Sequence, residues 1–340
     1  MKPLLPSMAE ALRLTRAGDP AGATRVLMAG ASGPTTSKAH VAAGPTPEKT
    51  SVIGGTVLEK RYTGAAGTLA YRLYLPANHG EAMPLVVMLH GCTQSPEDFA
   101  LGTGMDALAD ELGFMVAYPR QTSSANAQKC WNWFRPGDQQ RDRGEPSLIA
   151  GATRQILADH RGDPGRVYVA GLSAGGAAAA ILADQYPDLF AAVGVHSGLP
   201  CGAANDLSSA LTAMNSGGGA RTARKDRCFV PTITFHGDKD RTVNNANSVD
   251  IIAAAQAASD MPLTMHSMTE RQSGGRTYTR AVGTNAAGIA MLEQWTIHGA
   301  GHAWSGGQSA GSYTDPQGPD ASREMLRFFL SHRRVNSPPA

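Results

Sequence analysis

This chain of 340 residues contains few cysteines and few aromatic side chains, and it has no large surplus of charge of one sign. Its 30 lysines and arginines nearly balance 28 aspartates and glutamates, so no strong field draws nucleic acid or an anionic membrane. The basic run 221–227 is interrupted by Asp226, which is typical of a solvated loop. No apolar run reaches the roughly 20 residues that a membrane-spanning helix needs. We expect neither a nucleic-acid partner nor a membrane span.

The four cysteines lack the C-x-x-C spacing of zinc sites, and four cysteines admit three pairings. We predict the disulfides Cys92–Cys130 and Cys201–Cys228, because each would staple a long irregular segment to a strand end. Buried thiols are the alternative. Disulfides favour an extracellular or periplasmic location. The N-terminus lacks the lysine-rich start and unbroken apolar core of a Sec signal, so a cytoplasmic location stays open.

The chain divides into an N-terminal extension, residues 1–51, and a catalytic domain, residues 52–334. The extension pairs helical patterns with a linker rich in Gly, Pro, Ser, Thr and Ala. In the domain, strand and helix patterns alternate, which predicts an α/β fold with a mostly parallel sheet and helices on both faces. The expected strands are Thr56–Tyr62, Leu69–Leu75, Leu85–Leu89, Phe114–Tyr118, Val167–Ala170, Phe190–His196, Thr232–Phe235, Leu263–Met268 and Ile289–Ile297. The expected helices are Pro96–Leu112, Ser147–His160, Ala174–Tyr186, Asn245–Ala258 and Asp320–His332. Two long irregular insertions, Pro119–Pro146 and Ser197–Cys228, are expected to wall a pocket.

The most informative segment is VYVAGLSAGG, where an apolar run leads into a serine framed by glycines. Ser173 lies in a G-x-S-x-G pattern, which is typical of a strained strand-to-helix turn that exposes a nucleophile. A side chain at Gly171 or Gly175 would press on neighbouring backbone where strand and helix approach closely. Ser173 is therefore the predicted nucleophile.

An acid and then a histidine follow Ser173, which is the chain order of the α/β-hydrolase triad. The acid lies in HGDKDRTV and the histidine in HGAGHAW, and both motifs follow apolar runs. We predict Asp240 as the acid, with Asp238 as the alternative, and His302 as the base, because His298 falls at the strand end. The glycines between the two histidines make a poor helix for a metal pair. We expect neither a metal nor an organic cofactor.

Two backbone amides should stabilise the oxyanion of a tetrahedral intermediate. They are predicted to be those of Ala174, next to the nucleophile, and Cys92, in the loop after the first central strand. Trp131, Trp133 and Trp304 are candidate substrate-binding residues, since indole faces bind acyl chains, sugars or aromatic acids. The alternative is that Trp131 and Trp133 anchor their loop in the core.

Five motifs occur in order: HGCTQ, CWNWF, GLSAGG, HGDKDRTV and GHAWSGG. Together they resemble the esterase family of poly(3-hydroxybutyrate) depolymerases, which is related to feruloyl and acetylxylan esterases. The resemblance covers roughly Val52 to His332. It implies the α/β-hydrolase fold, a triad at Ser173, Asp240 and His302, and an oxyanion loop at Cys92. Many members of the family are secreted.

These observations predict a serine carboxylesterase that works through an acyl-enzyme. The resemblance implies short-chain hydroxyalkanoate esters as substrates, a small ester or a polyester oligomer related to 3-hydroxybutyrate. A feruloyl or acetylxylan esterase is the first alternative. A serine peptidase and a catalytically silent binding protein with the same fold are further ones. The oligomeric state is left open by the sequence.

Overall fold

A computed structural model describes Glu10, Val26 and residues 54–78, 80–219, 228–272 and 275–334. The predicted extension, residues 1–51, lies outside them apart from Glu10 and Val26. None of the helices formed by the described residues is long and apolar enough to cross a membrane.

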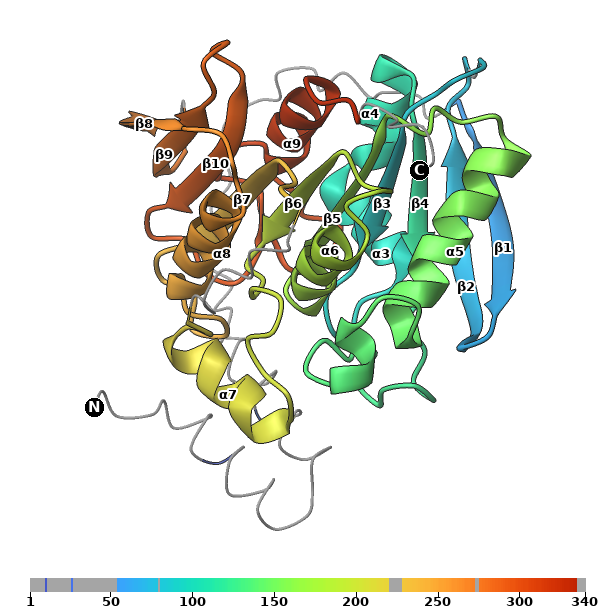
Figure 1. Cartoon of the computed structure of the whole chain (residues 1–340), viewed down its shortest axis with the longest axis horizontal. Coiled ribbons are helices and arrows are strands. Elements are labelled where there is room, and N and C mark those ends of the chain that lie inside the picture. Colours follow the sequence, from blue (N-terminus) through green and yellow to red (C-terminus); the bar gives the residue numbers. More distant parts are fainter. Residues whose placement is uncertain are drawn as a thin grey trace, which may run out of the picture.

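Within the described ranges, ten strands form one twisted sheet in the order β1-β2-β4-β3-β5-β6-β7-β10-β9-β8 (Figure 1). The middle of the sheet, from β4 to β10, is parallel, while β1, β2, β9 and β8 add antiparallel edges. The strands are β1 (Thr56–Gly64), β2 (Gly67–Leu75), β3 (Leu85–Leu89), β4 (Met115–Pro119), β5 (Val167–Leu172), β6 (Ala192–His196), β7 (Thr232–Gly237), β8 (Thr264–Arg271), β9 (Thr277–Thr284) and β10 (Ala290–Ile297). A separate short pair joins β11 (Trp304–Ser305) to β12 (Thr314–Asp315).

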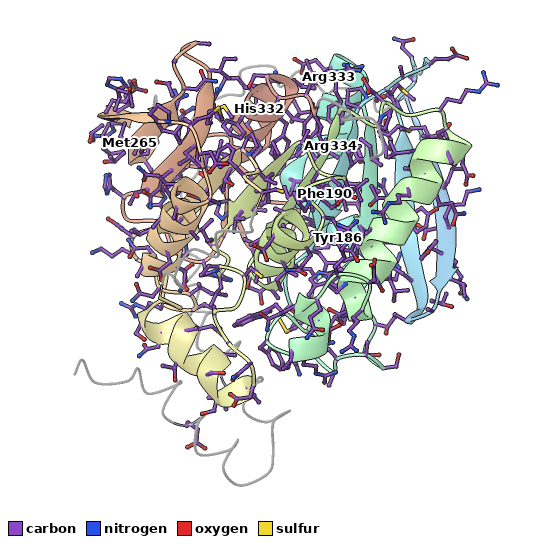
Figure 2. The ribbon with its side chains drawn as sticks, viewed as in Figure 1. Tyr186, Phe190, Met265, His332, Arg333 and Arg334 are labelled. Carbon is purple, nitrogen blue, oxygen red and sulfur yellow. A yellow bond between two sulfur atoms is a disulfide. The ribbon has the colours of Figure 1, made fainter. Side chains whose placement is uncertain are left out.

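Helices cover both faces of the sheet, which confirms the predicted fold class. The cluster on one face includes α5 (Gly144–Asp159), α6 (Ala174–Gln185) and α8 (Ala246–Ala257), and that on the other includes α3 (Pro96–Thr103), α4 (Met105–Leu112) and α9 (Ala321–Leu330). Central strands such as β3 (LVVML) are buried along their whole length, as continuous apolar runs in a covered parallel sheet should be. In Figure 2, Tyr186 and Phe190 lie in the interior, whereas Met265 lies on the outermost strand, β8.

The helix predicted over Pro96–Leu112 is two helices, α3 and α4, which meet at Gly104. Gly104 has φ +64°, a left-handed conformation that ends the first helix. A Cβ there would also lie 2.6 Å from Nε2 of Gln308. The apolar pattern runs through both helices, so the break could not be seen in it.

Several elements were missing from the predicted set, among them β9 and α7 (Leu207–Ser216). The strand β9 carries Arg280, which breaks the apolar alternation, but the guanidinium pairs with the fully buried Glu293 on β10 at 3.0 and 3.1 Å. Inside the Ser197–Cys228 insertion, residues Leu207–Ser216 form helix α7. Asp206 caps it by accepting the Ser209 amide at 2.7 Å, so the D-x-x-S spacing was the missed signal. A short 3₁₀ helix, η1 (Pro136–Gln139), lies in the other insertion.

Candidate active site

Ser173 lies on the sharp turn between β5 and α6 and has φ +58° and ψ −120°. This sparsely populated conformation is held by close backbone packing. A Cβ on Gly171 would lie 2.4 Å from the Gly175 carbonyl, and one on Gly175 would lie 2.0 Å from the Leu89 oxygen. The Ser173 amide donates to the His196 carbonyl at 2.9 Å. The glycines therefore have the steric role expected from the motif.

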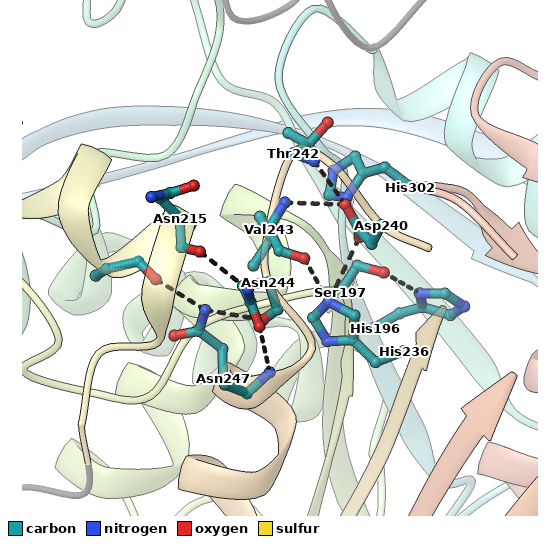
Figure 3. A network of polar contacts seen from close by, with 12 residues as sticks. His196, Ser197, Asn215, His236, Asp240, Thr242, Val243, Asn244, Asn247 and His302 are labelled. Atoms are coloured by element: carbon teal, nitrogen blue, oxygen red, sulfur yellow. Dashed lines mark hydrogen bonds and ion pairs between the residues drawn. The ribbon is translucent and has the colours of Figure 1, made fainter. Parts of the chain in front are cut away.

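Asp240 and His302 come together from the loops after β7 and β10. Nδ1 of His302 lies 2.7 Å from Oδ2 of Asp240, and both side chains are buried. The other carboxylate oxygen, Oδ1, accepts the backbone amides of Thr242 at 2.8 Å and Val243 at 2.9 Å. Figure 3 shows the carboxylate enclosed by these partners. Its position orients the His302 ring through Nδ1.

The pKa of Asp240 lies well below its ordinary value although the side chain is buried. Burial alone would raise this pKa, but the nearby His302 and the hydrogen bonds from His236 and His302 outweigh it. The carboxylate is therefore ionised throughout the neutral pH range.

Two buried histidines that the sequence analysis did not assign surround this pair (Figure 3). Nε2 of His236 lies 2.8 Å from the Val243 carbonyl and 3.4 Å from Oδ2 of Asp240, so the network assigns its proton to Nε2. Nε2 of His196 instead accepts the Ser305 amide at 3.0 Å, which leaves Nδ1 to donate to Ser197 Oγ. Burial lowers the pKa of His196 far below its usual range, and His236 and His302 add to the effect. His236 begins the HGDKD motif, so that signal was available in the sequence.

Ser173 and His302 border the same small cavity, which Cys92, Gln94 and Tyr313 also line. A second cavity of about 60 Å³ also borders Ser173 and is lined mainly by apolar side chains. Ala174 and Cys92 both border this second cavity. Ala174 is the first residue of α6, and first-turn amides of a helix have no acceptor within the helix. The two predicted oxyanion donors thus lie beside Ser173.

The loop that carries Cys92 is braced from several sides. A disulfide joins Cys92 to Cys130, which confirms that predicted pairing. Nδ1 of His90 donates to the Gly91 carbonyl at 2.8 Å, while its Nε2 accepts the Gln121 amide at 3.2 Å. Burial lowers the pKa of His90 to about 4, so the ring is neutral and can hold both contacts at once.

The predicted disulfide Cys201–Cys228 is wrong. The two residues border a common cavity, but both keep their thiols. Cys201 Sγ donates to Asp184 Oδ2 at 3.3 Å, and Cys228 is exposed. Spacing along the chain put the cysteines at the two ends of one insertion without determining where each sulfur points.

The three tryptophans divide between the pocket and the core. Trp133 lines the 60 Å³ cavity beside Ser173. Trp131 is fully buried and donates its indole N–H to the His90 carbonyl at 3.1 Å. Trp304 is also buried; it stacks on His196 and donates to Ser322 Oγ at 3.0 Å. The expectation that Trp131 and Trp304 contact substrate is therefore corrected, since their rings are enclosed and their N–H groups are used within the core.

The alternative acid and histidine form a pair of their own. Nδ1 of His298 lies 3.1 Å from Oδ2 of Asp238, and Nε2 of His298 contacts Thr279 Oγ1 at 2.8 Å. Asp238 also accepts the Gly299 amide at 2.7 Å. Among the described residues, no three His, Cys, Asp or Glu side chains form a metal-binding group. That the protein needs no metal stays a prediction.

Residues 69–261 match the family described as Esterase PHB depolymerase. Poly(3-hydroxyalkanoate) depolymerase C of Paucimonas lemoignei is 34% identical over 250 residues, which are 69% of this chain and 58% of that protein. Feruloyl esterase B of Thermothelomyces thermophilus is 34% identical over 139 residues, 41% of this chain and 47% of that protein. The chain thus spans about half the length of these curated relatives.

The fold is also found in a solved structure. Acetyl xylan esterase from Aspergillus awamori superimposes with a TM-score of 0.64 at 19% identity, covering 82% of this chain and 100% of that one. At this identity the likeness supports the fold alone. The family match spans more than half of the chain and includes Ser173 and Asp240. The chain belongs to the esterase PHB depolymerase family.

Proposed function

We propose that this chain is a serine carboxylesterase that hydrolyses short-chain hydroxyalkanoate esters through an acyl-enzyme. The observation that carries the proposal is that His302, bound to Asp240, borders the same cavity as Ser173 on its strained turn. A serine hydroxyl is a weak nucleophile on its own and needs such a base within reach. Catalytic hydrogen bonds of this kind often tighten only when substrate binds.

In the proposed mechanism, Nε2 of His302 takes the proton of Ser173 Oγ as the oxygen attacks the acyl carbon. The amides of Cys92 and Ala174 bind the oxyanion of the tetrahedral intermediate. His302 then donates the proton to the leaving alcohol, and the acyl group stays on Ser173. Water, activated by the same histidine, releases the acid. Asp240 stays ionised and stabilises the imidazolium that forms in each half-reaction.

The substrate class rests on the pocket and on the relatives. The cavity beside Ser173 is small and mostly apolar, which suits a short acyl group. A relative that matches much of this chain is named a poly(3-hydroxyalkanoate) depolymerase. Feruloyl and acetylxylan esterases are the second candidate, because relatives carry those names. The edge-to-face pair of Trp133 and Phe134 on the cavity wall also suits an aromatic acid.

The Cys92–Cys130 disulfide supports a proposed location in an oxidising compartment, outside the cell or in the periplasm. In a reducing compartment this bond would be open, and the brace on the oxyanion loop would be weaker.

The test compares hydrolysis of a soluble 3-hydroxybutyrate oligomer with that of methyl ferulate, using the full chain and Ser173→Ala. We expect the oligomer to be hydrolysed faster and Ser173→Ala to abolish activity. A fluorophosphonate should label Ser173 in the folded protein. Preference for methyl ferulate would favour the second candidate, and failure of both hydrolysis and labelling would overturn the proposal.

A further inference from the structure

Helix α7 forms one wall of the cavity beside Ser173. Met214, in its last turn, borders the cavity together with three other residues of the helix, Leu207, Ala210 and Leu211. Val243, three residues after Asp240, borders the same cavity. The width of the space next to the nucleophile therefore depends on where α7 lies.

The C-terminal end of α7 is held by two asparagines that follow the acid loop (Figure 3). The Asn244 amide donates to the Met214 carbonyl at 2.7 Å, and its Nδ2 donates to the Asn215 carbonyl at 2.9 Å. Nδ2 of Asn247 donates to the Ala213 carbonyl at 2.9 Å. The last carbonyls of a helix lack donors within the helix, so the bonds to Met214 and Asn215 satisfy groups that would otherwise need water. The Ala213 carbonyl also accepts the Gly217 amide at 3.0 Å, so Asn247 is its second donor.

Asn247 is suited to this role because it is fully buried and its amide is in use on both sides. Its Oδ1 accepts the Gly218 amide at 2.9 Å, just beyond the end of α7. Its Nδ2 also reaches the Asn244 carbonyl at 3.0 Å. One side chain thus joins the helix end, the segment after it and the acid loop.

The short segment from Asp240 to Val243 therefore supplies both the carboxylate that binds His302 and part of the cavity wall. Asp240 contacts His302, the Val243 amide contacts Asp240, and Val243 lines the cavity. Immediately after Val243, Asn244 and Asn247 form hydrogen bonds to the C-terminal end of α7. A shift of the helix would have to move this segment or break its hydrogen bonds.

We propose that Met214 determines how long an acyl group the cavity accepts, and that Asn244 and Asn247 are positioning residues that hold it there. This rests on the proposed esterase function and adds to it the residues that limit the length of the acyl group. Removing the thioether should extend the space next to Ser173 without touching the proposed proton-transfer residues. Removing the hydrogen bonds from Asn244 or Asn247 should let α7 move away from the cavity, so that longer acyl groups are accepted.

The test measures kcat and KM for p-nitrophenyl acetate, butyrate and octanoate. Met214→Ala should raise the octanoate-to-acetate ratio of kcat/KM by about tenfold, mainly through KM, and Met214→Phe should lower it. Asn247→Ala should shift the ratio in the same direction as Met214→Ala, by a smaller factor. Met265→Ala, on exposed β8, and Asn285→Ala, in the turn before β10, are the matched controls and should leave the ratio unchanged.

An unchanged ratio in both Met214 variants would overturn the proposal. If Asn247→Ala does not fold, Asn244→Ala tests whether these hydrogen bonds hold α7; it removes the Nδ2 contact to the Asn215 carbonyl and the Oδ1 contact to the Ala246 amide, and it keeps the backbone bond to Met214. Ser173→Ala separates the two proposals: residual activity there overturns the esterase mechanism itself. Loss of activity in Ser173→Ala with no change of ratio in the Met214 variants overturns only the inference about α7.

Discussion

The loops after β7 and β10 supply two Asp–His pairs, and the two pairs differ sharply in their surroundings. In the inner pair, Asp240 is 0% exposed and His302 8%, and their atoms lie 2.7 Å apart. In the outer pair, Asp238 is 26% exposed and His298 38%, and the distance is 3.1 Å. The same residue types at nearly the same sequence positions thus form a buried, tightly bound pair and a solvated one.

The two histidines also differ in what the second ring nitrogen, Nε2, can contact. Nε2 of His298 contacts Thr279 Oγ1, so this histidine is hydrogen-bonded at both nitrogens. The His302 ring borders the cavity that Ser173 also borders. A carboxylate–imidazole contact is therefore insufficient for the proposed chemistry; the imidazole must also face the hydroxyl.

Replacing the histidines should give the largest contrast between the pairs. We expect His302→Ala to lower kcat by about 10⁶, because the proton of Ser173 then has no acceptor, and His298→Ala to change kcat less than about threefold. Initial rates with p-nitrophenyl butyrate measure both. Equal losses in the two folded variants would contradict the distinction between inner and outer pair.

Replacing the acids should give a smaller contrast in the same direction. Asp240→Asn should lower kcat by about 10⁴, because an amide favours the wrong tautomer of His302, while Asp238→Asn should stay within about threefold of the wild type. The measurement is kcat with the same ester, with circular dichroism to show that both variants fold. A greater loss in Asp238→Asn would reverse the assignment of the acid.

A third carboxylate shows that burial alone does not determine ionisation. Glu145 is half-buried, and desolvation together with the neighbouring Asp138 raises its pKa to about 7 despite hydrogen bonds from Asn132 and Gln121. The folded state then binds a proton that the unfolded state has released, so stability falls as pH rises from about 4.5 to about 7, by about 3 kcal/mol at most. Glu145→Gln should flatten this decline.

Urea unfolding of the wild type and Glu145→Gln across that pH range checks the expectation. Asp240 has the opposite sign: its lowered pKa gives stability above the ordinary carboxyl pKa, which is lost on acidification. Glu111, an exposed carboxylate paired with Arg323, offers a control as Glu111→Gln. The idea fails if the pH dependence of Glu145→Gln equals that of the wild type.

The smallest expected effect concerns the outer pair and stability. Asp238→Asn should lower the free energy of unfolding by less than about 1 kcal/mol, because solvent screens a half-exposed ion pair. Urea unfolding at low and high salt measures it, and added salt should shrink the difference. A loss of several kcal/mol, insensitive to salt, would show that the outer pair is more than a solvated contact.

The sequence by itself determined the alternation of strands and helices, the turn at Ser173, and the order of serine, acid and histidine along the chain. These follow from local causes: continuous apolar runs form covered strands, and Gly171 and Gly175 leave room for backbone. The Cys92–Cys130 bond was predicted as well. The assignment of Asp240 over Asp238 remains a prediction; His302, the partner of Asp240, borders the cavity that Ser173 also lines.

Only the tertiary structure decided which of several residues of the same type lie at the site and which lie in the core. It buried Trp131 and Trp304 but set Trp133 on the cavity, and it turned Cys201 toward Asp184 instead of Cys228. It also brought α7 against the acid loop. The physical reason is common to these cases: side-chain direction and desolvation depend on neighbours far away in the chain, and local patterns contain no record of those neighbours.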